Sequence, residues 1–179
     1  MRDTIYCFPT EGEAAAFRAL RPDANVKIIG VGMAEATAVA ATCIATFSPR
    51  RLVLCGIAGA CDQRLQAGQV VEVVADAVAG LPEAYAEEYG AKATGRFSQA
   101  CSLTVSHSGD ALKYLSAESV LPCVEQMEGA GVAAACRIFD VEFYHLRAIS
   151  NRVGEDKSKW HIAEAVSSLG SAAAHLFEE

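Results

Sequence analysis

The chain has 179 residues, of which 52% are apolar and 21% are charged, and its formal net charge is −7 at pH 7. This apolar content excludes a disordered or acidic-tail protein, and the length suits one domain with a hydrophobic core. Acidic residues outnumber basic ones by 22 to 15, and the only run of basic residues is the pair Arg50-Arg51. A nucleic-acid-binding protein needs a basic face, so the composition argues against that class.

Neither a membrane span nor an export signal is predicted. A span needs about 20 consecutive apolar residues, and the first residues lead directly into a strand-like run without a signal-peptide core. The seven cysteines are odd in number and none are in CxxC spacing, which predicts reduced thiols in a cytoplasmic protein. No metal site is expected, because the four histidines lack ligand spacing: His107, His145, His161 and His175.

The first third of the chain alternates strand-like and helical runs. The expected strands are Thr4–Phe8, Val26–Val31 and Arg51–Cys55, and the expected helices are Glu11–Leu20 and Ala34–Phe47. A proline follows each helix closely, as expected of a residue that cannot continue one.

The rest of the chain opens on Val70–Val78, a β-branched run typical of a strand buried on both faces. The further expected elements are a short helix over Pro82–Tyr89, a loop and one strand within Thr94–Ser106, a short helix over Asp110–Leu115, a strand over Val120–Gln126, a helix over Gly129–Phe139, a strand over Phe143–Ile149 and a last helix capped by Ser158. This alternation predicts a single α/β domain over residues 1–179.

Candidate functional residues lie in the turns after the expected strands, where α/β sheets bind ligands. These turns are residues 9–13, 30–32, 56–60, 126–129 and 150–151. The turn Gly30-Val31-Gly32 begins like a dinucleotide-binding fingerprint, but Glu35 stands where the third glycine belongs. No P-loop is present either. No cofactor is expected, since carboxylate and amide side chains suffice for the chemistry.

Two motifs carry a family resemblance: Gln126-Met127-Glu128-Gly129-Ala130-Gly131-Val132-Ala133 and Arg147-Ala148-Ile149-Ser150-Asn151. They resemble the nucleoside phosphorylase and nucleosidase superfamily. The Gly56–Ala60 turn and the segment 150–160 are most similar to its futalosine hydrolase group, and Ser108–Ala111 matches a further nucleosidase segment. The resemblance implies a three-layer α/β/α sandwich with a mixed, mostly parallel central sheet, and cleavage of the N-glycosidic bond of a purine nucleoside.

The resemblance also implies residue roles. Glu128 would grip the ribose hydroxyls and favour positive charge on the sugar, and Met127 would pack against the sugar. Glu13 would orient and deprotonate water, with Glu11 as the alternative. Without the motif, the alternative explanation for each of these glutamates is an acidic residue in the first turn of a helix, where the helix dipole favours it. The other residues expected in the substrate site are Gln126, Ile57, Gly59, Arg147 and Leu112, of which Arg147 would organise the carboxylates.

Asn151 stands where the related 5′-methylthioadenosine/S-adenosylhomocysteine nucleosidases carry an aspartate that donates a proton to adenine. An amide cannot donate an acidic proton, but its NH₂ can donate hydrogen bonds to the acceptors of a 6-oxopurine. The asparagine therefore favours hypoxanthine over adenine as the leaving group. The plain alternative is a turn asparagine.

Two features depart from the family pattern. The chain is short between about Asp76 and Thr104, and Leu112 replaces an aromatic residue that would stack on the base. They support one alternative hypothesis, an inactive paralogue that binds a nucleoside without cleaving it.

The leading hypothesis is hydrolysis of futalosine to hypoxanthine in menaquinone synthesis. The second is a methylthioadenosine/S-adenosylhomocysteine nucleosidase that releases adenine. Hydrolysis is favoured over phosphorolysis because the glycine turns carry no arginine for phosphate. A homodimer is expected by resemblance, and neither nucleic acid nor a membrane is expected as a partner.

Overall fold

The computed structural model describes residues 3–115 and 119–178. Its elements, in chain order, are β1 (Thr4–Phe8), α1 (Glu11–Leu20), β2 (Val26–Ile28), α2 (Met33–Phe47), β3 (Arg51–Ala60), β4 (Val70–Val78), the 3₁₀ turn η1 (Glu83–Tyr85), β5 (Glu88–Gly90), β6 (Ser98–Thr104), η2 (Asp110–Lys113), β7 (Cys123–Gln126), α3 (Gly129–Ile138), β8 (Glu142–Arg152), η3 (Lys157–Lys159) and α4 (Ile162–Ala174). The predicted alternation of strands and helices is confirmed. The differences concern where elements end and the segment 82–90, in which a short 3₁₀ turn and a strand replace the predicted helix.

Two strands are longer than predicted. β3 does not end at Cys55 but continues to Ala60, because β8 pairs with it along its length and β7 pairs with Gly59 and Ala60. The segment Gly56–Ala60 is therefore the carboxyl end of a strand, and the predicted glycine turn there is wrong. β8 likewise extends to Arg152, which places Asn151 within a strand beside Gly59.

The predicted helix over Pro82–Tyr89 is wrong beyond one 3₁₀ turn, because β5 begins at Glu88 and pairs antiparallel with β4. The predicted cap of the last helix is wrong as well. His161 is the N-cap of α4, whereas the hydroxyl of Ser158 donates to Asp156 within η3. The remaining shifts are shorter: β2 ends at Ile28, β7 begins after Pro122, and η2 is a single 3₁₀ turn.

The strands form one mixed sheet that closes on itself. β1 lies between β2 and β3, and both pairings are parallel. β3 continues to β7, β6 and β4, and β8 joins β4 back to β3, which makes a ring of five strands. The α/β class is confirmed, and most of the described strand pairings are parallel.

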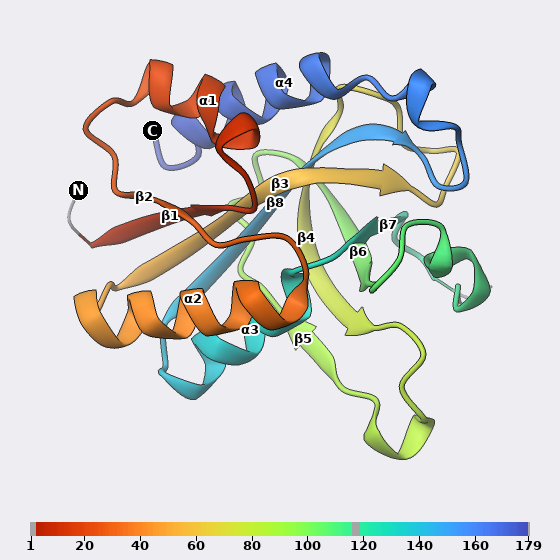
Figure 1. Ribbon diagram of the computed structural model, residues 1–179, viewed down its shortest axis with the longest axis horizontal. Coiled ribbons are helices and arrows are strands. Elements are labelled where there is room, and N and C mark those ends of the chain that lie inside the picture. Colours follow the sequence, from red (N-terminus) through yellow and green to blue (C-terminus); the bar gives the residue numbers. More distant parts are fainter. Residues whose placement is uncertain (1–2, 116–118, 179) are drawn as a thin grey trace.

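Two pairs of helices flank β1 and β3 on opposite sides, α2 with α3 and α1 with α4 (Figure 1). Because side chains alternate along a strand, Ile5 and Leu52 face the first pair, and Tyr6 and Val53 face the second. A third cluster of apolar side chains lies among the strands of the ring. Within the described residues, no helix has both the length and the apolar character that a membrane crossing requires.

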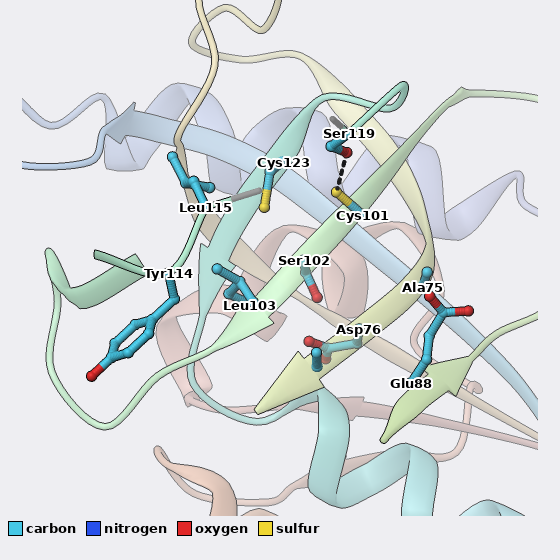
Figure 2. Close-up of a pocket in the computed structure, with 11 residues that line it drawn as sticks. Ala75, Asp76, Glu88, Cys101, Ser102, Leu103, Tyr114, Leu115, Ser119 and Cys123 are labelled. Atoms are coloured by element: carbon cyan, nitrogen blue, oxygen red, sulfur yellow. Dashed lines mark hydrogen bonds between the residues drawn. The ribbon is translucent and has the colours of Figure 1, made fainter. Parts of the chain in front are cut away.

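The parallel strands β4 and β6 are joined without a covering helix. Their connection, residues 79–97, contains only η1 and β5, whereas such connections usually carry a helix that packs on the sheet. A cavity of about 350 Å³ lies there instead, lined by Cys101 and Leu103 of β6 and by Tyr114 and Leu115 of the following loop (Figure 2). The same region, between about Asp76 and Thr104, is the one in which the sequence is shorter than the family pattern.

Candidate active site

A larger cavity, of about 720 Å³, lies at the carboxyl ends of β1, β3, β7 and β8. It brings together eight of the nine predicted site residues: Glu13, Ile57, Gly59, Gln126, Met127, Glu128, Arg147 and Asn151. The ninth, Leu112, is not part of its wall. The Leu112 side chain is 49% exposed and reaches towards Gly154, where an added Cβ would lie 3.7 Å from its Cδ1.

Glu13 is held in the cavity by the start of α1. Thr10 is the N-cap of this helix and accepts a hydrogen bond from the Glu13 amide, while its hydroxyl donates to Glu13 Oε2 at 2.7 Å. Glu13 Oε1 accepts from the Ile57 amide of β3 at 2.9 Å. One helical turn later, Phe17 packs on Tyr6 and Phe8 and fixes the face of the helix. The alternative residue, Glu11, is exposed and pairs with Arg18.

Arg147 is the centre of the polar network. Its Nη2 lies 3.0 Å from Glu128 Oε2, with side chains only 1% and 4% exposed. The guanidinium also donates to the carbonyl of Ile57 at 3.1 Å and to Nε2 of His145 at 2.7 Å. Burial, followed by the charge of Arg147, lowers the pKa of His145 well below its usual range, so its neutral ring accepts this bond. Arg147 is thereby committed to protein acceptors.

Gly56 makes room for this arginine. A Cβ at Gly56 would lie 2.4 Å from Arg147 Nη1 and 3.3 Å from Glu13 Oε1. Only glycine lets β3 pass between the two charged side chains. From the sequence, this glycine was predicted to lie in a turn. In the structure it lies within β3, and a glycine is needed there because Arg147 packs against it.

Glu128 faces the cavity because other side chains satisfy the start of α3. Gln126 Oε1 accepts from the amides of Glu128 and Gly129 at 2.8 and 2.6 Å. The Glu128 carboxylate therefore need not accept the first N–H groups of α3. Its Oε1 instead accepts from the Gly32 amide at 3.0 Å. The carboxylate therefore ties the turn after β2 to Arg147, which a plain helix-terminal glutamate would not do.

Asn151 has both ends of its amide engaged. Its Oδ1 accepts from the Ser150 hydroxyl at 2.7 Å, and its Nδ2 donates to the carbonyl of Arg152 at 2.8 Å. The residue is 6% exposed and lies beside Gly59. Its orientation is consequently defined, with the NH₂ on the side of the Arg152 carbonyl.

The sequence analysis missed part of the wall. Trp160, Ile162, Ala163 and Val166 line the cavity from the segment around the start of α4, and Ser108 and Glu125 line it from the side of β6 and β7. Trp160 is the only tryptophan of the chain, which was a usable signal, but the remaining residues carry no motif. Among the described residues, no group of three or more His, Cys, Asp or Glu side chains is arranged to hold a metal ion.

Comparison with known proteins relates the chain to nucleosidases. No family model matches the chain. A curated futalosine hydrolase of Thermus thermophilus is 44% identical over 57 residues, which are 31% of this chain and 25% of that protein. A futalosine hydrolase of Streptomyces coelicolor is 35% identical over 88 residues, 49% of this chain and 32% of that protein. The matches therefore span only a quarter to a third of these relatives.

The solved structures match nearly end to end. Futalosine hydrolase of Helicobacter pylori superposes with a TM-score of 0.83 at 14% identity, covering 97% of this chain and 96% of that one. A putative methylthioadenosine/S-adenosylhomocysteine nucleosidase of Francisella philomiragia gives 0.84 at 16% identity and covers both chains fully. The chain has the nucleosidase fold. The predicted resemblance to nucleosidases is confirmed for the fold and for the parts of the sequence that match futalosine hydrolases.

One matched nucleosidase was solved with a nucleoside analogue. The Neisseria meningitidis enzyme, in complex with methylthio-immucillin-A, has a TM-score of 0.79 at 15% identity, covering 98% of this chain and 96% of that one. Proteins with the nucleosidase fold thus include one that binds a small nucleoside-like molecule.

Asp76 supports the cavity from outside its wall. Its Oδ2 accepts from Gln126 Nε2 and from the Thr104 hydroxyl, both at 2.9 Å, which orients the Gln126 amide towards Glu128 and Arg147. Its Oδ1 has no hydrogen-bond partner among the described residues. Burial raises the pKa of Asp76 to about 6.

We expect Asp76→Asn to stabilise the protein at neutral pH. A raised carboxyl pKa means that the native state binds the proton more tightly than the unfolded chain. The native state therefore loses stability as pH rises from about 4 to about 6, and stays at the lower level above that. The amide keeps an acceptor in the place of Oδ2 and carries no charge, so the gain in unfolding free energy at pH 7.5 is on the order of 1–3 kcal/mol.

Urea unfolding at pH 4 and at pH 7.5 measures this difference. The gain is expected at pH 7.5 and should vanish at pH 4. Asp62→Asn is the control, because Asp62 forms an exposed pair with Arg64 and its loss is worth little. A lower unfolding free energy for Asp76→Asn than for the parent protein, by the same amount at both pH values, would contradict this explanation.

Proposed function

We propose that the chain is a purine nucleosidase that hydrolyses the N-glycosidic bond of futalosine and releases hypoxanthine. The observation that carries the proposal is the pair of buried carboxylates, Glu13 and Glu128, which face one cavity from different elements. Glu13 accepts a hydrogen bond from the Ile57 amide, Glu128 pairs with Arg147, and Arg147 donates to the Ile57 carbonyl. The matches to futalosine hydrolases over parts of the chain support the same substrate.

In the proposed mechanism, Glu13 is the general base. Each of its oxygens accepts one protein hydrogen bond, from Ile57 and from Thr10, and retains a lone pair for water. Water attacks C1′ of the ribose and gives its proton to Glu13. The C1′–N9 bond breaks, and its electron pair leaves with the purine, which then takes a proton from solvent.

Glu128 acts on the sugar. Its carboxylate accepts hydrogen bonds from ribose hydroxyls and lies close enough to favour the cationic sugar of the transition state. Arg147 holds the carboxylate in position and offsets part of its charge in the free enzyme. In the part of the chain that the structure describes, the buried acids around the cavity outnumber the one buried arginine, which suits a substrate that becomes positively charged.

Hydrolysis fits better than phosphorolysis. The one cation in the cavity wall is Arg147, among the described residues, and its guanidinium already donates to Glu128, Gln126 and Ile57. A phosphate would need positively charged donors that are free to reach it.

A methylthioadenosine/S-adenosylhomocysteine nucleosidase is the second candidate. It is favoured by the structural match to the Francisella philomiragia protein, which covers the whole chain. The two candidates differ in the leaving base. Asn151 supports hypoxanthine, since one NH₂ proton remains after the bond to the Arg152 carbonyl and can be donated to N7 or O6 of a 6-oxopurine.

Base release without phosphate tests the proposal. Futalosine, inosine and methylthioadenosine are incubated in parallel, and the bases are separated by liquid chromatography, with Glu128→Gln as the inactive control. Hypoxanthine from futalosine, lost in the control, is the expected result. Adenine from methylthioadenosine alone would favour the second candidate, and no release with saturable nucleoside binding would favour an inactive paralogue.

Asn151→Asp is expected to move the preference towards adenine. In the native arrangement Nδ2 faces the carbonyl of Arg152, so the introduced carboxyl group would place an oxygen against another acceptor. That contact favours its protonated form and makes it a proton donor for a purine. We expect the ratio of kcat/KM for methylthioadenosine over futalosine to rise by about tenfold or more, in line with a change of one hydrogen-bonding group. Asn151→Ser, which supplies no carboxyl group, is the control and should lower both rates together.

We further propose one domain over residues 1–179, organised as a three-layer α/β/α sandwich and active as a cytoplasmic homodimer without metal or cofactor. The two helix pairs that flank β1 and β3 support the layers. Six exposed apolar side chains among the described residues of the stretch 81–120 support self-association, namely Leu81, Tyr85, Leu112, Tyr114, Leu115 and Val120. A role in menaquinone synthesis would follow from futalosine as the substrate.

A further inference from the structure

Glu125 is a buried acid that the proposed mechanism does not use. It lies on β7, is 6% exposed and lines the large cavity next to Ser108. No salt bridge of the described residues includes it, and its negative charge is met by backbone N–H groups. Gly109 donates to Oε1 at 2.8 Å and to Oε2 at 3.0 Å, and Ala111 donates to Oε2 at 2.9 Å.

These three contacts hold the segment His107–Lys113 against the body of the protein. The segment is largely exposed, and Ala111 is its one residue without accessible surface. The ion pairs of Asp110 with His107 and Lys113 stay within the segment and do not anchor it. A buried carboxylate that accepts several N–H donors is among the stronger neutral–charged contacts in proteins.

The anchored segment approaches the turn that follows β8. Ser108 contributes to the cavity wall, and Leu112 reaches Gly154, three residues after Asn151. The segment and the end of β8 therefore approach each other at one side of the cavity. In the proposed function this is the side on which Asn151 meets the purine.

We propose that Glu125 is a positioning residue that holds the His107–Lys113 segment, and with it Ser108, at the purine side of the cavity wall. The inference rests on the proposed nucleosidase function and adds to it a determinant of base binding. Three of the four lone pairs of the Glu125 carboxylate accept from backbone N–H donors, so we assign Glu125 to holding the segment rather than to binding the base or transferring a proton. Its loss should therefore weaken substrate binding and leave the chemical step nearly intact.

We call the contacts of the Glu125 carboxylate with the amides of Gly109 and Ala111 the clamp. The chain offers a matched control for it. Glu72 on β4 is 2% exposed and accepts from the amides of Thr94 and Gly95 at 2.7 and 3.0 Å. It holds a loop by the same kind of contact, but neither Glu72 nor that loop lines the large cavity. Glu72→Gln thus shows how KM and kcat change when a similar set of contacts is lost away from the site.

The first test compares Glu125→Gln with Glu72→Gln. The amide keeps one acceptor oxygen but turns an NH₂ group towards a backbone donor, so each variant loses part of its clamp. We expect Glu125→Gln to raise KM for futalosine about tenfold with kcat within about threefold, and Glu72→Gln to change neither by more than about twofold. An unchanged KM in Glu125→Gln, or an equal change in both variants, would overturn the proposal.

Two glycine variants cover the case in which a glutamate variant fails to fold. Gly109 and Gly95 are the clamped glycines, with φ of 98° and 79°, and an added Cβ would meet nothing within 4 Å at either. Alanine would strain the backbone at both positions without a steric clash. We expect Gly109→Ala to raise KM severalfold and Gly95→Ala to leave it unchanged. Equal KM values would count against the clamp.

Limited trypsin digestion separates this inference from the proposed function. Lys113 ends the clamped segment, and its side chain is 68% exposed. Glu125→Gln should be cut after Lys113 several times faster than the parent protein, and Glu72→Gln should instead be cut faster after Arg96. If the parent protein releases no base, the function fails while faster cutting at Lys113 still supports the clamp. Unchanged cutting there would overturn the clamp whatever the activity.

Discussion

Replacing Glu13 by glutamine is expected to lower kcat for base release by about 10²–10⁴-fold. The amide can still accept from the Ile57 amide through one oxygen, and its NH₂ can donate to the Thr10 hydroxyl, so the start of α1 keeps its contacts. What is lost is the ability to take a proton from water. We therefore expect KM and the unfolding free energy to change little, which assigns the loss to the chemical step.

Glu11→Gln is the matched control. Glu11 lies in the same first turn of α1, but it is exposed and pairs with Arg18 outside the cavity. Single-turnover release of hypoxanthine from futalosine measures both variants. The assignment would be reversed if Glu11→Gln lost activity and Glu13→Gln retained more than about a tenth of the parent rate.

Arg147→Met is expected to lower the unfolding free energy by about 3–5 kcal/mol, a large part of the stability of a domain of this size. The guanidinium is buried and contacts Glu128, Gln126, His145 and the carbonyl of Ile57. Its removal leaves Glu128 charged, buried and unpaired, which is the costly outcome for an ion pair. Base release should be lost as well, because Glu128 no longer keeps its position.

The double variant Arg147→Met/Glu128→Gln tests this explanation. It removes the unpaired charge, so urea unfolding should show that part of the lost stability returns, while activity stays absent. A destabilisation of Arg147→Met below about 1 kcal/mol, or no recovery in the double variant, would mean that the pair does not hold the site together.

Much of the site was predictable because its residues belong to recognisable sequence motifs. Glu128 and Arg147 belong to the two motifs that carry the family resemblance, and both reach the cavity. Glu13 could be separated from Glu11 only by the structure. Both residues lie in the first turn of α1, and sequence spacing does not tell which side of the turn faces Ile57.

Other residues were out of reach because their role depends on a distant partner. Glu125 carries no motif of its own, and its importance comes from amides 14 and 16 residues away in the chain. Asp76 reads as one acid within a β-branched strand, yet it orients Gln126, which is 50 residues away. Leu112 was expected in the substrate site because the resemblance places it where an aromatic residue would stack on the base, but η2 directs its side chain towards Gly154.

The sequence by itself determined the α/β alternation, the acidic and non-basic character of the protein, and the motifs with Glu128, Arg147 and Asn151, because these depend on local patterns and residue types. The tertiary structure decided where strands end and how the sheet closes. β3 runs through Gly56–Ala60 because β7 and β8 pair with it, and Gly56 is needed because Arg147 passes there. Pairing and close packing join residues far apart in the chain, and no local pattern encodes them.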